Sequence, residues 1–310
     1  MSTSTSNSSS ATNSAVSELR SIDRHLIDRR HRIAVFDSGV GGLTVLRAIA
    51  AIIPNADYLY FGDTARLPYG SKSRETVARY AIGAARFLEQ QKPDILVIGC
   101  NTACALALYD VRSAVDIPVI GVIDPGAERA AEVSRSREAV VIGTEATIST
   151  HAYQRALAKR GFATHEKACP LFVALVEEGW TDHPVTEHVA RIYLAEALGS
   201  ASAHTDVLVL GCTHYPLIRS LLRRVVPANI EIVDSAEATA QAVADELDAL
   251  DGVGQAPRSA PDSPDGTEPP SPAAPTFHFY VTDSAEKFSR MAPLFLGHPI
   301  ENVEHVDLGG

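Results

Sequence analysis

The sequence predicts an α/β protein of two pseudo-symmetric lobes, each a mainly parallel sheet flanked by helices, with the active site in the inter-lobe cleft. The first observation is a repeat, because DILVIGCNT at 94–102 returns as DVLVLGCTH at 206–214. The second is that VIDPGAE follows the first copy and IVDSAE the second. The third is that a continuous apolar run precedes each Gly-Cys, as in parallel strands buried on both faces. Each cysteine is therefore expected at the carboxyl end of a strand, where open α/β sheets bind ligands.

Composition limits the classes of partner. The chain carries 38 acidic and 27 basic residues, a formal charge of −11, so neither a nucleic acid nor an anionic membrane surface is expected to bind it. The 4 cysteines among 310 residues are too few for a disulfide framework, and the sequence opens without an apolar signal segment. No apolar run approaches the ~18 residues of a membrane span. These features predict a cytoplasmic protein.

The first lobe is expected from residues 31–125 plus 236–310. A Ser/Thr-rich tail at 1–30 and a Pro-rich insertion at 252–276 are expected to be disordered, because neither has apolar periodicity. The expected strands are 33–36, 58–61, 95–98, 119–123, which ends in Asp124-Pro125-Gly126, 277–281 and 300–306. The expected helices begin in the turn after Asp37, cover 74–90 and 103–115, and follow Asp283.

The second lobe is expected from residues 126–235. Its expected strands are 139–142, 207–210 and 230–233, and its expected helices are 151–160, 184–198 and 217–226. The glycine-and-threonine turn GTEATIST follows the first of these strands and places hydroxyl groups at a strand end. In LFVALVEEGW at 171–180, Glu177 and Glu178 close an apolar run.

A glycine-rich turn, DSGVGGLT, joins the first strand to the first helix. Unpaired N–H groups and the helix dipole make such a turn an anion site. It lacks the third glycine of a dinucleotide fingerprint, and Asp37 would repel a pyrophosphate. A small carboxylate or amino acid suits the turn better, with Asp37 available to an ammonium group or as a proton acceptor. The later loop GDTARLPYGSKS has the composition of a binding loop, although composition alone favours a surface turn.

Two thiols at matching strand ends are open to several interpretations. Free cysteines are common in protein cores, so both could be structural. A zinc site could draw on Cys100, Cys104, Cys212 and His214, although no CxxC or HxxxH motif supports it. A Cys-His hydrolase would use Cys212 and His214 and leave Cys100 idle, and a binding protein would need no thiol. A racemase needs an acid/base group on each face of the substrate carbon and would use both thiols. Each thiol would lie near a helix N-terminus, which is expected to lower its pKa.

The chain resembles glutamate racemases, of the cofactor-independent aspartate/glutamate racemase family, through six motifs in that family's order. These are FDSGVGGLTVL, YFGDTARLPYGSKS, GCNTA, IGTEATI, CPLFVALVEEG and LGCTHYPLI. The resemblance covers about residues 33–250 and resumes at 277. It implies interconversion of L- and D-glutamate without a cofactor or a bound metal, supplying D-glutamate for peptidoglycan and so for cell-wall biogenesis and cell shape. An aspartate racemase is the alternative within the family, and a homodimer is an assembly that the resemblance allows.

The resemblance also assigns residues. Cys100 would serve D-glutamate with the help of Asp37, and Cys212 would serve L-glutamate with the help of Glu177 and His214. The implied substrate contacts are Asp37, Ser38, Tyr69, Gly70, Asn101, Thr102, Thr213 and His214, with Thr144 and Thr147 as further candidates. The chain departs from the family pattern at Cys104 and Ala174. Cys104 and Cys169 are expected to be structural.

Overall fold

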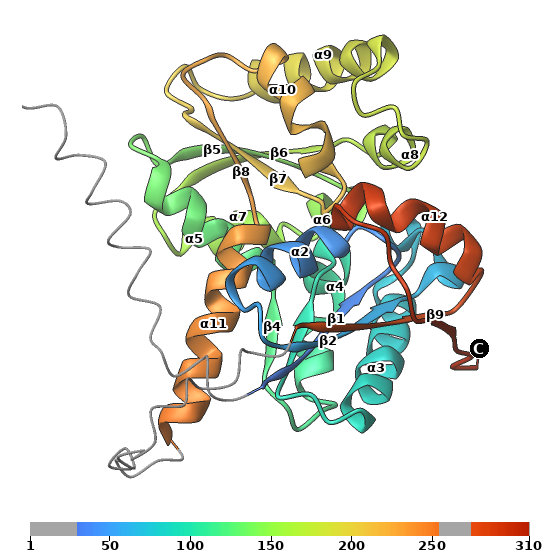
Figure 1. Ribbon diagram of the computed structural model, residues 1–310. Coiled ribbons are helices and arrows are strands. Elements are labelled where there is room, and N and C mark those ends of the chain that lie inside the picture. The colour runs from blue at the N-terminus through green and yellow to red at the C-terminus, as the bar shows by residue number, and fades with distance from the viewer. Residues whose placement is uncertain (1–29, 254–273, 310) are drawn as a thin grey trace, which may run out of the picture.

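A computed structural model describes residues 30–253 and 274–309 of the chain. These residues form two parallel sheets, one in each of two lobes (Figure 1). The larger sheet has the strand order β10-β9-β2-β1-β3-β4, in which every neighbouring pair is parallel. Its strands are β1 (Arg32–Asp37), β2 (Asp57–Gly62), β3 (Ile95–Ile98), β4 (Val119–Gly121), β9 (Thr276–Val281) and β10 (Val303–His305). The predicted α/β class with two parallel sheets is confirmed.

The smaller sheet has the order β6-β5-β7-β8 and is also parallel throughout. Its strands are β5 (Glu138–Gly143), β6 (Ala163–Ala168), β7 (Val207–Gly211) and β8 (Glu231–Asp234). In chain order, both sheets repeat one pattern: the first strand lies between the second and the third, and the fourth lies beyond the third. The two lobes are therefore related by topology, and the thiol-bearing strands β3 and β7 hold equivalent places.

Helices cover both faces of each sheet. Those of the first lobe are α2 (Leu43–Ile52), α3 (Arg74–Gln90), α4 (Asn101–Arg112), α11 (Ala236–Val253) and α12 (Ala285–Leu296), with 3-10 turns at η2 (Thr64–Arg66) and η3 (Tyr69–Ser71). Those of the second lobe are α5 (Ile123–Val133), α6 (Glu145–Ser149), α7 (Ala152–Ala158), α8 (Leu171–Glu177), α9 (Pro184–Gly199) and α10 (Arg219–Val225), with a 3-10 turn at η4 (Tyr215–Ile218). Helix α11 packs mainly on α2 and also on α5, so it spans both lobes (Figure 1).

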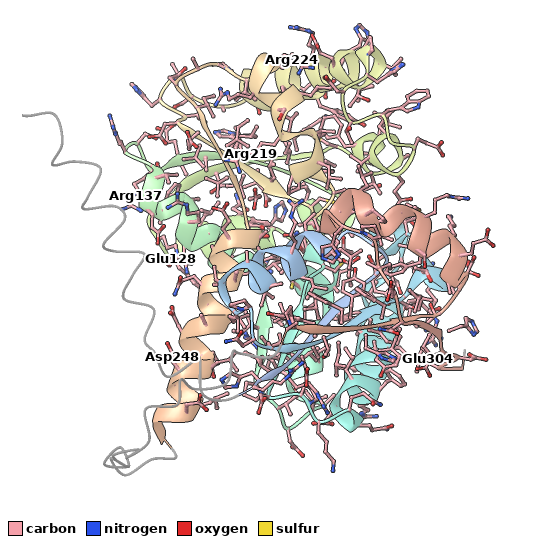
Figure 2. The ribbon with its side chains drawn as sticks, viewed as in Figure 1. Glu128, Arg137, Arg219, Arg224, Asp248 and Glu304 are labelled. Carbon is pink, nitrogen blue, oxygen red and sulfur yellow. The ribbon has the colours of Figure 1, made fainter. Side chains whose placement is uncertain are left out.

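The strands form because their apolar runs are buried between these helix layers. Every residue of β3 is fully buried, and all of β7 is buried as well. Burial on both faces leaves no place for a polar side chain, which explains the continuous apolar runs of the sequence. Charged side chains such as Arg224 and Glu304 lie on the outside of the molecule (Figure 2). No helix within the described ranges is long and apolar enough to cross a membrane.

Several expected boundaries are wrong. The strand expected at 119–123 ends at Gly121, and α5 begins at Ile123, so Asp124-Pro125-Gly126 lies in a first helical turn. Proline is tolerated there because the first turn needs no N–H donor from it. Helix α4 begins at Asn101, two residues earlier than expected, because Cys100 is its N-cap. The helix expected at 217–226 is the 3-10 turn η4 followed by α10.

Strand β6 was missed because it is a half-exposed edge strand with polar residues. The expected insertion at 252–276 is shorter at both ends, since α11 runs to Val253 and β9 begins at Thr276. Residues 254–273 and most of the expected tail at 1–30 lie outside the described residues.

Candidate active site

The carboxyl ends of strands from the two sheets meet at the boundary between the lobes. Hydrogen bonds cross this boundary, since Thr102 Oγ1 lies 2.8 Å from Thr144 Oγ1 and Tyr153 Oη donates to Asn101 Oδ1 at 2.8 Å. Close packing also crosses it. A Cβ added at Gly41 would lie 2.3 Å from Thr213 Oγ1, so only glycine fits there. The residues expected to bind substrate from both lobes are therefore in direct contact.

Cys100 follows β3 and caps helix α4. Its Sγ accepts a hydrogen bond from the N–H of Ala103 at 3.4 Å and lies 3.4 Å from Ser38 Oγ. The helix terminus was expected to lower the pKa of this thiol, but burial outweighs that effect. Burial raises the pKa of Cys100, the charge of Asp37 raises it further, and the hydrogen bonds from Ser38 and Ala103 offset only part of the rise. Cys100 therefore holds its proton in this structure.

Asp37 ends β1 and is buried. Its Oδ2 accepts from the N–H of Gly39 at 2.8 Å, and its Oδ1 has no hydrogen-bond partner among the described residues. Burial raises the pKa of Asp37, while the charge of His214 and the N–H groups of the glycine turn oppose the rise. A Cβ at Gly42 would lie 2.6 Å from Asp37 Cβ, so the turn must be glycine to pack on this carboxyl group. Its Oδ1 is therefore a buried polar atom without a partner in the described part of the chain, available to a ligand or to a proton.

Cys212 follows β7 and has a different set of partners. Its Sγ lies 3.9 Å from Nδ1 of His214, whose Nε2 lies 3.0 Å from Glu177 Oε1. Burial would lower the pKa of His214, but its hydrogen bonds to Cys212 and Glu177 outweigh burial and raise that pKa to about 10. The imidazole is therefore a cation at neutral pH, held between a thiol and a carboxylate.

The two thiols belong to one site. The charge of Asp37 acts on Cys100, and the charge of His214 acts on Asp37. His214 in turn contacts Cys212. This series of neighbours crosses from the first lobe to the second, and Cys100 and Cys212 are only 5% and 6% exposed.

Three threonine hydroxyls gather beside the thiols. Thr144 Oγ1 lies 2.9 Å from Thr147 Oγ1, and Thr102 Oγ1 lies 3.4 Å from Thr147 Oγ1. Thr144 is also the N-cap of α6, and a Cβ at Gly70 would meet its Cβ at 3.3 Å. The predicted contacts Gly70, Thr102, Thr144 and Thr147 thus lie together across the boundary.

The hydroxyl of Tyr69 is bonded to a neighbouring carboxylate, so this side chain is not placed as a substrate ligand. Its hydroxyl donates to Asp63 Oδ2 at 2.5 Å, and Asp63 Oδ1 accepts from Thr282 at 2.8 Å and from Arg66 at 3.1 Å. The phenol therefore anchors the loop before Gly70, and Gly70 is the residue of this loop that packs against Thr144. Sequence reasoning missed Asp63, because nothing in a loop of turn residues signals that one carboxylate is fully buried.

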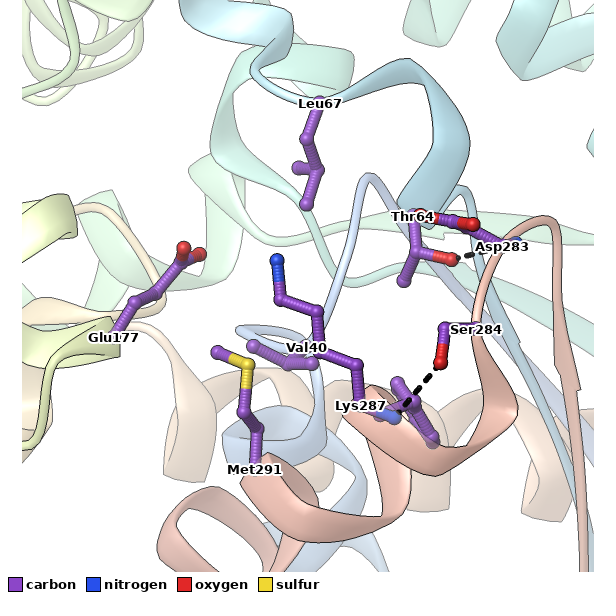
Figure 3. A pocket seen from close by; sticks show the side chains of 9 residues that line it. Val40, Thr64, Leu67, Glu177, Asp283, Ser284, Lys287 and Met291 are labelled. Atoms are coloured by element: carbon purple, nitrogen blue, oxygen red, sulfur yellow. Dashed lines mark hydrogen bonds between the residues drawn. The ribbon is translucent and has the colours of Figure 1, made fainter.

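A small pocket opens beside Glu177, between the loop after β2 and helix α12 (Figure 3). Its volume of about 30 Å³ is enough for one or two water molecules. In Figure 3 the side chain of Lys287 extends between Glu177 and Leu67, and Val40 of the glycine turn lies next to it. The sequence did not indicate that α12 lies near the site, because only folding brings these residues, distant in sequence, together.

The zinc alternative would need clustered ligands. The described residues include no group of three or more His, Cys, Asp or Glu that could hold a metal ion. Cys104 bonds to the backbone of its own lobe, donating to Ile98 O at 3.2 Å and accepting from Val122 N at 3.4 Å. It therefore does not turn toward Cys100.

Known proteins with the same sequence pattern are racemases. A family model described as Asp/Glu/Hydantoin racemase matches residues 42–243. A glutamate racemase of Koribacter versatilis is 57% identical over 91% of this chain and 99% of its own length. The crystal structure of glutamate racemase from Thermus thermophilus in complex with β-chloro-D-alanine is 41% identical, with a TM-score of 0.75 over 90% of this chain and 98% of that chain. The corresponding structure from Francisella tularensis in complex with D-glutamate is 32% identical, with a TM-score of 0.77 over the same shares. The chain therefore belongs to the Asp/Glu/hydantoin racemase family, together with the glutamate racemases.

Proposed function

We propose that this protein interconverts L- and D-glutamate, with Cys100 and Cys212 as the two acid/base groups. The observation that carries the proposal is that two buried thiols follow equivalent strands of the two sheets and meet in one site. A racemase must remove the Cα proton from one face and deliver a proton to the other. One thiol on each side of the substrate carbon satisfies that requirement.

In the proposed reaction, the Cys100 thiolate takes the Cα proton of D-glutamate and the Cys212 thiol protonates the carbanion from the opposite face. L-Glutamate results, and the reverse reaction exchanges the two roles. Cys100 must first lose its own proton, and Asp37 is the neighbouring acceptor. His214 and Glu177 assist Cys212, because an imidazolium beside a thiolate favours the charged form of the sulfur.

The proposed substrate contacts are polar groups that lie around the thiols. Asp37 Oδ1, which has no partner within residues 30–253 and 274–309, suits the substrate ammonium group. Asn101, the hydroxyls of Ser38, Thr102, Thr144, Thr147 and Thr213, and the backbone at Gly70 suit the carboxylates. The relatives crystallised with D-glutamate and with β-chloro-D-alanine support an amino acid as the ligand.

Circular dichroism of purified enzyme with each enantiomer of glutamate and of aspartate tests the proposal. The signal of either glutamate enantiomer should decay to that of the racemate, while aspartate should change much more slowly. Turnover of aspartate but not glutamate would overturn the substrate assignment. Loss of activity with EDTA would favour the metal site, and hydrolysis of thiol-protease substrates in place of racemisation would favour the Cys-His hydrolase.

D-Glutamate made by this reaction would be supplied to peptidoglycan synthesis, and we place the enzyme in the cytoplasm. Its four cysteines, all described, are free thiols, as expected of a protein in a reducing compartment. A homodimer stays a prediction, which light scattering during size-exclusion chromatography would test.

A further inference from the structure

Tyr153 of helix α7 touches both thiol-bearing segments. Its hydroxyl donates to Oδ1 of Asn101, the residue directly after Cys100, at 2.8 Å. Its ring lies against Gly211, the residue directly before Cys212, where an added Cβ would be 3.1 Å from Cε2 of the tyrosine. Tyr153 is fully buried. One side chain of the second lobe therefore connects the two strand ends that carry the thiols.

Glycines leave the space that this tyrosine occupies. A Cβ at Gly126 of helix α5 would lie 3.1 Å from the Tyr153 hydroxyl oxygen, tighter than ordinary van der Waals contact. The equivalent contact at Gly211 is just as close. The ring is therefore held from two sides, and its hydroxyl can reach Asn101 in only one direction.

The hydrogen bond decides how the Asn101 amide is oriented. Burial raises the pKa of Tyr153, the charge of Cys104 raises it further, and a hydrogen bond from Ser235 opposes the rise, so the phenol keeps its proton. A protonated phenol donates its proton to an acceptor, and Oδ1 is the only acceptor on an amide side chain. Nδ2 of Asn101 is then turned away from Tyr153. It is buried and has no partner in the described part of the chain.

A buried amide donor without a partner costs free energy, so it is kept for a ligand. We propose that Tyr153 is a positioning residue, which fixes the Asn101 amide with Nδ2 directed at the substrate and holds the Cys100 and Cys212 segments in register across the lobe boundary. The inference rests on the proposed function, because the Asn101 amide is proposed to bind a substrate carboxylate. Tyr153 itself does not touch the reacting atoms.

A double-mutant cycle tests this role through Tyr153→Phe, Asn101→Ala and the double variant. Removal of the hydroxyl should raise KM for both glutamate enantiomers about tenfold and change kcat less than about threefold, because an orienting hydrogen bond acts on binding. In the Asn101→Ala background the same change should alter KM less than about twofold. Tyr58→Phe is the matched control. It removes another buried phenol, bonded to Ile53 O in the first lobe, and should leave KM and kcat unchanged.

Two outcomes would overturn the role of Tyr153. One is an unchanged KM in Tyr153→Phe, and the other is an equal rise of KM in both backgrounds, which would mean that Tyr153 acts without Asn101. Melting temperatures of all variants separate a loss of fold from a loss of orientation, since Tyr153→Phe should melt within a few degrees of Tyr58→Phe. Failure of the proposed function is distinguished beforehand, because wild-type protein would then not racemise glutamate.

Discussion

The two thiol regions have equivalent backbones and different chemistry. Cys100 and Cys212 follow the third strand of their respective sheets. Cys100 caps a helix of 12 residues, whereas Cys212 leads into a 3-10 turn of 4 residues. The neighbours of Cys100 are a hydroxyl and a buried carboxyl group, whereas Cys212 contacts an imidazole that is itself bonded to a half-buried carboxyl group.

The difference shows how one repeated fold can surround two thiols with unlike titratable neighbours. Burial raises the pKa of Asp37, which brings that carboxyl group closer to the protonated form at neutral pH. Hydrogen bonds raise the pKa of His214 to about 10, which keeps it cationic. Both shifts favour the protonated form, which is neutral for Asp37 and cationic for His214. Topology therefore sets where the thiols lie, and the flanking residues set the charge around each of them.

Replacing either thiol should have the largest effect. Cys100→Ser and Cys212→Ser should each lower racemisation by roughly a thousandfold or more, because inversion needs a group on both faces. Elimination of HX from a β-substituted glutamate analogue needs a base on only one face. Cys212→Ser, which keeps Cys100, should therefore act on the D-analogue, and Cys100→Ser on the L-analogue. Halide release from each enantiomer measures this.

The opposite enantiomer preferences of the two serine variants distinguish the two-thiol mechanism from the alternatives. A Cys-His hydrolase would depend on Cys212 alone, and a zinc site would lose its metal in either variant. If both variants lost elimination activity on both enantiomers equally and still gave a native circular-dichroism spectrum, the two-thiol mechanism would be wrong.

The flanking acids should show the same asymmetry at a smaller scale. Asp37→Asn and His214→Asn should each lower kcat/KM for racemisation by roughly 10²- to 10⁴-fold, the usual range for a group that assists proton transfer. The two directions must fall together, because their ratio is fixed by an equilibrium constant near one. Elimination is free of that constraint. Asp37→Asn should mainly slow the D-analogue, and His214→Asn the L-analogue. Equal slowing of both analogues by each variant would mean that the partners are shared.

His214 should also make the second thiol region depend on pH. The pKa of His214 is about 10 in the folded protein against an ordinary value of 6.5, so the folded state binds the proton more tightly. The stability from this proton is fully present below about pH 6.5 and is lost as the pH rises through about 10. The unfolding free energy of wild type should therefore exceed that of His214→Asn by more at pH 6 than at pH 10.5. Between these two pH values the excess should fall by an amount on the order of a few kcal/mol. Urea unfolding at both pH values measures it, and a difference that stays constant or grows with pH would contradict it.

Strands and helices could be predicted from the sequence where the local residue pattern matches the way the segment is buried in the fold. The thiol strands were recognisable because residues buried on both faces leave an uninterrupted apolar run. Edge strand β6 has no such run, since it is half exposed and carries polar residues. The start of α5 was missed because Pro125 suggests a break, although a first helical turn accepts proline.

The site was recognisable to a similar extent. The repeat identified both cysteines, and the motifs around them supplied their neighbours. The contacts of Tyr153 and Asp63 could not be predicted, because each depends on partners distant in sequence. Tyr153 reaches Asn101 across the lobe boundary, and Asp63 reaches Thr282 through the pairing of β2 with β9. Such contacts become visible only once the lobes are assembled.

The smallest effect is expected from the cysteine one helical turn beyond Cys100. Burial raises the pKa of Cys104 to about 12, and it raises that of Cys100 as well, so pKa does not separate the two. Their partners do, because Cys104 exchanges hydrogen bonds with the backbone at Ile98 and Val122. Cys104→Ser keeps a donor and an acceptor there, so kcat/KM should stay within about threefold while stability falls by about 1–2 kcal/mol. Cys169→Ser should have the same small effects on kcat/KM and on stability. Steady-state kinetics with thermal melts checks both, and a loss of several orders of magnitude in a folded variant would mean that position on the strand end does not define the catalytic thiols.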